Sequence, residues 1–212
     1  MMPHPDFSAF IPFVNRPDLV ARVQKAFLKA GIMPSLIDNS GPLPLTFSQS
    51  MNYEFETALQ KNRKFILLAH SDADIPDGSI TALIDFARAQ YDNDVRWSVI
   101  YTHYDVLCAY NIACYQSIGG YDTNIRAYKS DQDWYHRCDL SNWKRINTDI
   151  PCNHGVEGEG SQTINSDPRL KYLNGYIQQL DSLYYASKWG GDAGQEIYSV
   201  PFNRPDLFGG PK

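Results

Sequence analysis

Two aspartates separated by one small residue follow the longest apolar stretch of the chain. Asp72 and Asp74 come shortly after the run Phe65–Ala69, in the segment Ser71-Asp72-Ala73-Asp74. Carboxylates at this spacing can hold a divalent cation, because hard cations prefer oxygen ligands. Aspartate is also common in solvated turns, so an Asp-x-Asp pattern alone is a weak indication of a site. Its position after an apolar strand favours a ligand site over a solvated turn.

The elements that must position these aspartates alternate between strand and helix. Apolar runs and helical spacings predict strands near 10–14, 35–37 and 65–69 and helices near 17–30, 51–59 and 80–87. The run Phe65–Ala69 is apolar at every position, which is typical of a strand covered by helices on both faces. The alternation therefore predicts an α/β fold with a doubly wound sheet.

Polar residues follow each predicted strand at its carboxyl end. Asn15 and Arg16 come after the first strand, Asp38 and Asn39 after the second, and the acidic loop 71–74 after the third. Doubly wound sheets bind their ligands at the carboxyl ends of the strands. The topology and the chemistry together predict one binding site formed by these three segments.

The composition is that of a soluble globular protein. The chain has 212 residues, of which 43% are hydrophobic and 20% charged, and one domain is expected. A net charge of −5 argues against nucleic acid or an anionic membrane as the main partner, because phosphate binding usually requires a basic surface. An acidic protein can still bind a phosphate-bearing ligand if a metal ion supplies the positive charge. We see no signal peptide or membrane span, and the four scattered cysteines indicate reduced thiols, so we expect a cytoplasmic protein.

Segments spread over about residues 8–155 resemble, in the same order, those of family 2 glycosyltransferases, which have the GT-A fold. Residues 52–76 resemble the donor-binding segment of that family, which is a helix, an apolar strand and an acidic pair. Residues 112–122, which end in Gly119-Gly120-Tyr121-Asp122, resemble its acceptor-side segment. The further similar segments are 11–17, 38–41 and 130–137. The likeness is closest to the small glycosyltransferase domain of large chlorella viruses. It implies a GT-A fold with a mixed, mostly parallel central sheet flanked by helices.

The resemblance also implies a nucleotide-sugar site with a divalent ion, Mn²⁺ or Mg²⁺. Asp74 would bind the metal, and Asp72 would support it or face the ribose. Asp38 would accept a hydrogen bond from the base. The residues expected at the nucleotide are Pro12, Asn15, Arg16, Asp38, Asn39, Asn52 and Asp72. The ion would neutralise the charge that develops on the leaving diphosphate.

A carboxylate in the segment Ser130-Asp131-Gln132-Asp133 is the expected general base. An inverting transferase needs a carboxylate near the acceptor hydroxyl to take its proton. We favour Asp131 over Asp133, but the family usually has Glu where this chain has Ser130, which leaves the choice open. The same segment also fits a capping box at the start of a helix.

Three further residues have a structural interpretation, and two of them also have a functional one. His154 precedes a glycine-rich segment, and it could complete the metal site or be a surface histidine. Lys188, near the end of a predicted long helix, could reach the diphosphate or only complement the helix dipole. His70 is expected to have a structural role.

Together these features predict a single GT-A domain over residues 1–212, with a nucleotide-binding half up to about 100 and an acceptor-side half after it. The expected activity is metal-dependent transfer, with inversion, of glucose, galactose or a rhamnose-like sugar from a UDP-sugar to a glycan or glycoprotein hydroxyl. The chain would be a monomer or part of a longer multidomain protein, in the host cytoplasm if viral. A nucleotidyltransferase that makes a nucleotide sugar is an alternative, although the first loop lacks the expected glycines. A non-catalytic carbohydrate-binding module is another, but it leaves the acidic clusters unexplained.

Overall fold

A six-stranded sheet with the strand order β2-β1-β3-β6-β5-β7 forms the centre of this computed structural model, which describes residues 4–102, 105–156 and 160–208. The strands are β1 (Phe7–Phe13), β2 (Ser35–Asp38), β3 (Phe65–Ala69), β5 (Trp97–Tyr101), β6 (Leu107–Asn111) and β7 (Lys144–Asn147). β6 runs antiparallel to its neighbours β3 and β5, and the other adjacent strands are parallel. The expected mixed, mostly parallel sheet is confirmed.

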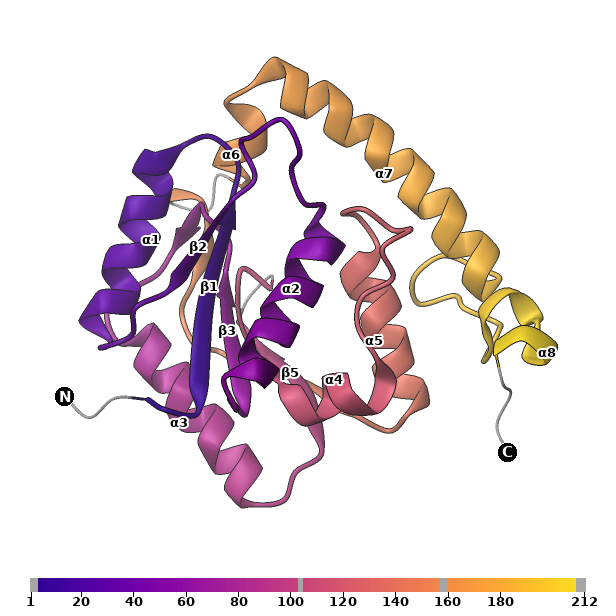
Figure 1. The fold of residues 1–212 in the computed structure, drawn as a ribbon, viewed down its shortest axis with the longest axis horizontal. Helices are drawn as coiled ribbons and strands as arrows, with labels where there is room; N and C mark the ends of the chain where they lie inside the picture. Colours follow the sequence, from indigo (N-terminus) through magenta and orange to yellow (C-terminus); the bar gives the residue numbers. More distant parts are fainter. Residues whose placement is uncertain (1–3, 103–104, 157–159, 209–212) are drawn as a thin grey trace.

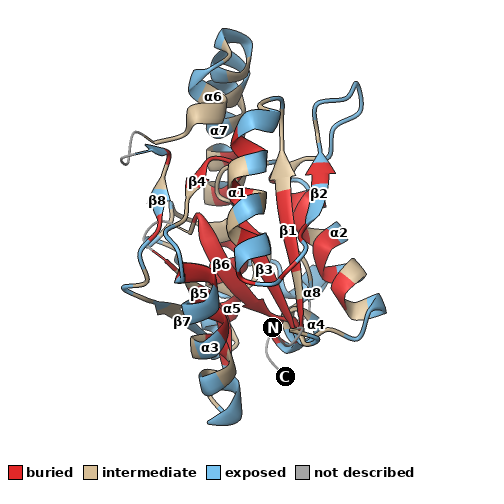
Figure 2. Cartoon of the chain, turned by 90° about the vertical axis from the view of Figure 1, so that its left-hand side faces the viewer, coloured by how far each residue is buried: buried red, intermediate tan, exposed pale blue. Residues whose placement is uncertain are grey.

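Helices cover both faces of the sheet, as Figures 1 and 2 show. One face carries α1 (Pro17–Lys29) and α3 (Ser79–Asp92), and the other carries α2 (Phe47–Gln60), α4 (Ile112–Ile118) and α5 (Ser130–Leu140). Successive side chains of a strand point to opposite faces. Accordingly, Leu67 of β3 joins the core under α1 and α3, whereas Ile66 and Leu68 join the core under α2 and α5.

A second part of the chain crosses the carboxyl-terminal edge of the sheet. It comprises a two-stranded ladder of β4 (Ala73–Asp74) and β8 (Asn153–His154), the short helix α6 (Gln162–Asn165) and the long helix α7 (Pro168–Trp189). Figure 1 shows α7 running from α6 past α5 toward α8 (Pro205–Phe208), and α7 also contacts η2 (Pro201–Asn203). Within the described ranges, no helix has both the length and the apolar sequence that crossing a bilayer needs.

Two buried contacts hold α7 against the rest of the fold. The carboxylate of Asp181 accepts hydrogen bonds from the backbone N–H groups of Arg126 and Ala127, at 3.1 and 2.9 Å. Tyr185 and Trp189 pack with Ile125 in a third small core. These contacts lie in the C-terminal half of α7, so the N-terminal half reaches over the edge of the sheet, where the candidate site lies.

Candidate active site

An open cavity of about 570 Å³ lies at the carboxyl ends of β1 and β3. Its walls come from the ends of these strands, the start of α5 and the segment that leads from β8 through α6 into α7. The residues that give it polar chemistry include Asn39, His70, Ser71, Asp72, Asp105, Lys129, Asp131, Gln132, His154, Ser161 and Thr163. The cavity therefore lies where the predicted topology locates a ligand.

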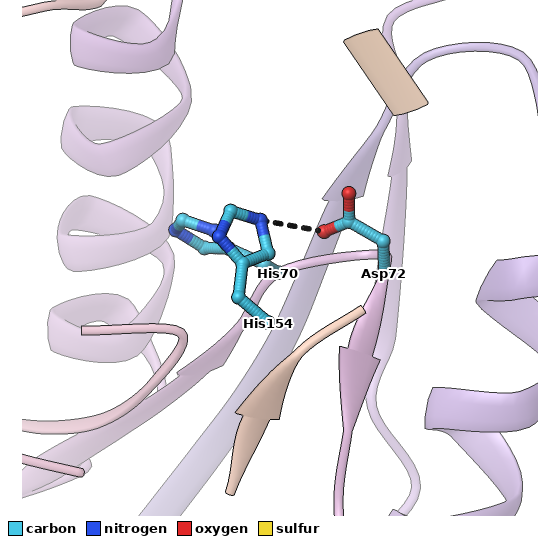
Figure 3. Close-up of side chains that lie close together, drawn as sticks. All are labelled: His70, Asp72 and His154. Carbon is cyan, nitrogen blue, oxygen red and sulfur yellow. Dashed lines mark ion pairs between the residues drawn. The ribbon is translucent and has the colours of Figure 1, made fainter. Parts of the chain in front are cut away.

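A tight turn after β3 brings the first set of polar groups together. The Ala73 N–H donates to the His70 carbonyl at 3.1 Å, and the His70 N–H donates to the Val106 carbonyl at 2.9 Å. The turn places the side chains of His70 and Asp72 on the same side, where His154 joins them (Figure 3). One ligand atom from each of these three residues lies within 4.8 Å of the others.

The β4–β8 ladder explains why His154, more than eighty residues away in sequence, reaches this turn. In the antiparallel register Ala73 is opposite His154, and the Gly155 N–H donates to the Asp72 carbonyl at 3.0 Å. The His154 Nε2 atom thereby lies 3.4 Å from the Asp72 Oδ1 atom. Gly155 has a φ of 77°, which suits glycine, and a Cβ there would clash with the Gly160 carbonyl.

Asp72 is nearly fully buried and is held by the α6 segment. Its Oδ2 atom accepts hydrogen bonds from the Ser161 hydroxyl at 3.1 Å and the Thr163 N–H at 3.2 Å. Burial by itself would raise the pKa of Asp72, but the interaction with His154 and the hydrogen bond from Thr163 lower that pKa well below its usual range. Asp72 is therefore a carboxylate, with its Oδ1 atom directed toward the histidines.

The three side chains fit a divalent metal ion. A carboxylate and two imidazoles are a common donor set for transition metals. Two donors about 2.1 Å from one ion lie about 3.0–3.4 Å apart in octahedral or tetrahedral geometry, so donor atoms within 4.8 Å of one another need to approach by at most about 1.8 Å. Burial lowers the pKa of His70, which favours the neutral imidazole that binds metals.

The structure does not bring Asp74 into this group. Asp74 lies beyond the turn, in β4, where it pairs with Asn153. Burial, with a smaller effect of the Asp74 charge, raises the pKa of the nearby Cys152 thiol to about 11. Among the described residues, the cavity wall includes Asp72 and not Asp74. The tight turn at 70–73 separates the two carboxylates that the sequence pattern suggested would act together.

Asp131 lines the same cavity from the first turn of α5. The predicted capping box is wrong, because the N-cap is Lys129, in a left-handed conformation with a φ of 66°, and the Ser130 hydroxyl donates to the Ala127 carbonyl. Asp105 lines the same cavity near Asp131. Burial and the charge of Asp105 raise the pKa of Asp131 to about 6. A carboxylate with such a pKa suits proton transfer near neutral pH.

Asp133 points away from the cavity into a buried cluster of charges. Its two carboxylate oxygens accept from Lys188 at 2.6 Å, from the Trp189 indole at 2.8 Å and from Arg137 at 3.1 Å. Lys188 also pairs with Asp122 at 2.7 Å, and its side chain is only 7% exposed. Lys188 is therefore engaged inside the protein, and it is not among the described residues that line the cavity. With its oxygens engaged in this way, Asp133 is poorly placed to act as a base.

Of the residues expected at the nucleotide, Pro12 and Asn39 line the cavity together with Asp72. Asn15, Arg16 and Asp38 follow β1 and β2 but are not part of its wall; Arg16 pairs with Asp18 at 2.7 Å, and Asp38 accepts from the Ser40 N–H at 2.8 Å.

Asn52 has a structural role in α2. Its amide exchanges two hydrogen bonds with the Tyr121 backbone, at 2.9 and 2.7 Å, and a Cβ on Gly120 would lie 2.3 Å from its oxygen. This contact explains Gly120, whereas Gly119 has a φ of 83°, which suits glycine.

Several residues of the site have no sequence signal that would identify them. Arg22 of α1 donates to the carbonyls of Asp72 and Ala73 at 3.1 and 3.3 Å, and these hydrogen bonds stabilise the backbone of the turn. Asp105 and Ser161 lie in segments without a motif. His70 had a signal, since it stands two residues before Asp72 in the spacing of the Asp-x-Asp pattern, but we expected a structural role for it.

Comparison with known proteins gives matches in structure only. No protein-family model and no curated protein matches the sequence. The mannosyltransferase PcManGT from Pyrobaculum calidifontis, solved in complex with GDP-Man and Mn²⁺, is similar with a TM-score of 0.54 and 10% identity, over 91% of this chain and 79% of that chain.

Two weaker matches are a glycosyltransferase involved in the glycosylation of the major capsid of PBCV-1 and a cytidylyltransferase from Leptospira borgpetersenii. The first has a TM-score of 0.44 and 11% identity, over 68% of this chain and 81% of that chain. The second has a TM-score of 0.42 and 11% identity, over 92% of this chain and 100% of that chain. The likeness to the mannosyltransferase confirms the expected fold class: this chain has the GT-A fold of nucleotide-diphospho-sugar transferases.

Proposed function

We propose that this protein is a metal-dependent glycosyltransferase that moves a sugar from a nucleoside diphosphate to a hydroxyl group, with inversion at the anomeric carbon. One observation carries the proposal: a single cavity at the carboxyl edge of a GT-A sheet contains three clustered side chains that fit a metal ion, His70, Asp72 and His154, and a carboxylate with a raised pKa, Asp131. A one-step displacement needs a site that stabilises the leaving diphosphate and a base that takes the proton of the attacking hydroxyl, and both would lie in this cavity.

The charges of the cavity support the requirement for a metal ion. Its described walls carry three carboxylates, Asp72, Asp105 and Asp131, against one lysine, Lys129, which is itself paired with Asp192 at 2.6 Å. A diphosphate would be repelled from this surface unless a cation accompanied it. A bound divalent ion stabilises the charge of the departing diphosphate. The histidines and Asp72 would hold that ion at the β3 end of the cavity.

The residues of the chain then have distinct roles. Pro12 and Asn39, at the ends of β1 and β2, would contact the nucleoside. Asp131 would accept the proton of the acceptor hydroxyl as its oxygen attacks the anomeric carbon, and Asp105 would set the pKa of that base. Ser161 and Thr163 would keep the carboxylate of Asp72 in position through the hydrogen bonds described above.

We propose a UDP-sugar carrying glucose, galactose or a rhamnose-like residue as the donor, and a glycan or glycoprotein as the acceptor. The resemblance to family 2 glycosyltransferases supports UDP. GDP-mannose is the donor to test beside the UDP-sugars, because the similar mannosyltransferase was solved in complex with it.

Nucleotidyl transfer is less well supported by the same cavity. A nucleoside triphosphate brings more negative charge than a diphosphate sugar, and the described wall of the cavity offers it one lysine and no arginine. A binding module without activity would not need a base, and it leaves the raised pKa of Asp131 without a role.

Donor binding tests the proposal directly. We expect the wild-type protein to bind UDP or GDP by calorimetry in the presence of Mn²⁺ and not in EDTA, and to release the nucleotide slowly from the matching nucleotide sugar. The variant Asp72→Asn should weaken metal-dependent binding at least about tenfold. The control variant Asp77→Asn, which removes an exposed carboxylate paired with Lys29, should bind as the wild type does. If neither diphosphate binds with Mn²⁺, the proposed function is incorrect.

The activity should fall as the pH falls through about 6, because Asp131 then becomes protonated and cannot accept a proton. Asp105→Asn removes a negative charge beside Asp131, which lowers the pKa of that carboxyl group and shifts the acid limb of the pH profile to lower pH. The profile of kcat for both proteins, measured at saturating Mn²⁺, checks this expectation. An acid limb at the same pH in both proteins would show that another group controls it.

A further inference from the structure

We infer that this protein forms a homodimer in which the outer face of α7 packs against the same face of a second copy, with the two helices antiparallel. The feature behind it is an apolar stripe along the outer side of this helix. Its members are 48–81% exposed: Tyr172, Leu173, Tyr176, Leu180 and Leu183. Such a dimer does not depend on the proposed function, and it replaces the sequence-based expectation of a monomer.

The two faces of α7 are the reverse of those of an ordinary surface helix, which turns its apolar side to the core and its polar side to water. The inward side of α7 carries Asn174 and Gln178, which line the cavity. It also carries Asp181, whose carboxylate binds the backbone at 126–127. The apolar stripe is therefore left on the outer side, and Figure 1 shows α7 at the periphery of the molecule.

The spacing of the stripe is that of a seam between two helices. Four of its members follow one another at intervals of three, four and three residues: Leu173, Tyr176, Leu180 and Leu183. This is the a–d repeat of helices that pack side by side. Within this stretch the only charged residue is Asp181, which is buried on the inward side. No charge on the outer face between 173 and 183 therefore opposes contact with a second apolar surface.

A second copy in antiparallel orientation matches this seam. With a two-fold axis beside the middle of the stripe, Leu173 lies opposite the partner's Leu183, and the reverse contact follows by symmetry. Tyr176 lies opposite the partner's Leu180 in the same way. Arg169, which is exposed, then lies beside the C-terminal turn of the partner's α7, where the helix dipole favours a cation.

The exposed area of the stripe is large enough for a specific dimer. A large side chain has roughly 200 Å² of surface, and the exposed fractions of the five residues amount to about three such side chains. A contiguous apolar patch of about 600 Å² usually marks an interaction site. Two copies would bury up to about 1,200 Å² from their stripes alone, which reaches the lower limit of specific protein–protein interfaces.

Dimerisation would also hold one wall of the cavity in place. The N-terminal half of α7 lines the cavity, yet most of residues 169–180 are exposed. Asn174 anchors this half through a hydrogen bond to the Tyr128 hydroxyl. Because helices in proteins are stabilised mainly by packing, a second copy would supply contacts that this half of the helix otherwise has in small number.

A membrane surface is the main alternative partner for an exposed apolar helix. Interfacial helices are usually rich in lysine and arginine, and the exposed basic residues of α7 are Arg169 and Lys171, both near its start. The net charge of −5 also opposes binding to anionic lipids. The lack of charge along the stripe itself and its a–d spacing favour a second copy.

Sedimentation velocity tests the inference on the wild-type chain. We expect the mass of two chains at about 100 µM, because an interface of this size reaches roughly micromolar affinity. Leu180→Glu places a charge in the middle of the seam and should weaken dimerisation at least about tenfold. Met33→Glu is the matched control, because it introduces the same charge at a residue that is 71% exposed and precedes β2, at the opposite edge of the sheet. The control should remain a dimer.

Cysteine cross-linking tests the orientation of the two helices. A mixture of Tyr176→Cys and Leu180→Cys proteins should form a disulfide-linked heterodimer with oxidised glutathione, since these positions face each other in an antiparallel pair. Leu173→Cys alone should not form a linked dimer, although a parallel pair would bring its two copies together. The four native cysteines are buried and give little background.

Three results would overturn the inference. One is a wild-type protein with the mass of a single chain at about 100 µM, and flotation of that monomer with neutral lipid vesicles would assign the stripe to a membrane. Another is a dimer that Leu180→Glu does not weaken, which would locate the interface elsewhere. The third is cross-linking of Leu173→Cys with itself and not of the mixed pair. Circular dichroism shows whether each variant is folded, as expected for changes at exposed positions.

Discussion

Changing Asp131 to asparagine should lower the rate of sugar transfer by about 10²- to 10⁴-fold, which is the usual contribution of a positioned general base. The amide keeps the size of the side chain but cannot accept the proton of the acceptor hydroxyl. Asp131 lies at the start of α5, and the proposed metal site lies after β3, so donor binding should be unaffected. Single-turnover transfer and calorimetric binding of the nucleotide, measured on the same protein, separate the two effects.

Hydrolysis of the donor provides the internal comparison for this variant. A water molecule that attacks the sugar depends less on a base than an acceptor hydroxyl held in place does, so slow nucleotide release should persist in Asp131→Asn. Loss of both transfer and release, with folding intact, would instead place Asp131 in donor binding. Transfer at the wild-type rate would contradict the assignment of the base, and Asp105, its neighbour across the cavity, would become the next candidate.

The position of the site could be predicted from the sequence because it depends on elements with strong local signals. The run Phe65–Ala69 is apolar at every position and forms the fully buried β3. Helical spacing and the glycine at 31 defined α1 in the same way. Once these elements alternate, the carboxyl edge of the sheet is the expected ligand site, and the cavity found there includes Asp72 and Asp131.

The roles of individual side chains could not be predicted with the same success, because they depend on contacts between distant segments. The turn at 70–73 decides that His70, and not Asp74, shares a side with Asp72, and a short motif carries no information about that turn. The choice between Asp131 and Asp133 likewise depends on Lys188 and Trp189, more than fifty residues away. Asp105 raises the pKa of Asp131 because it lies nearby in the fold, and it belongs to no sequence motif.

The variant Lys188→Met should show the second large effect, which is a loss of stability. Lys188 is buried between Asp122 and Asp133, and its removal takes the cation from Asp122 and leaves Asp133 with Arg137 alone. Breaking a buried ion pair by removing one partner typically costs about 3–5 kcal/mol of unfolding free energy. For a chain of this length, that loss corresponds to a melting temperature lower by roughly 6–20 °C. Thermal and urea unfolding, followed by circular dichroism, measure it.

The same variant decides whether Lys188 serves the fold or the nucleotide. Lys29→Met is the matched control, because Lys29 and Asp77 form an exposed pair whose loss should cost at most about 1 kcal/mol. At a temperature where Lys188→Met is still folded, its affinity for the nucleotide with Mn²⁺ should equal that of the wild type, since the lysine is engaged by two internal carboxylates. A variant with wild-type stability but at least about tenfold weaker diphosphate binding would instead show that Lys188 leaves this cluster to contact phosphate.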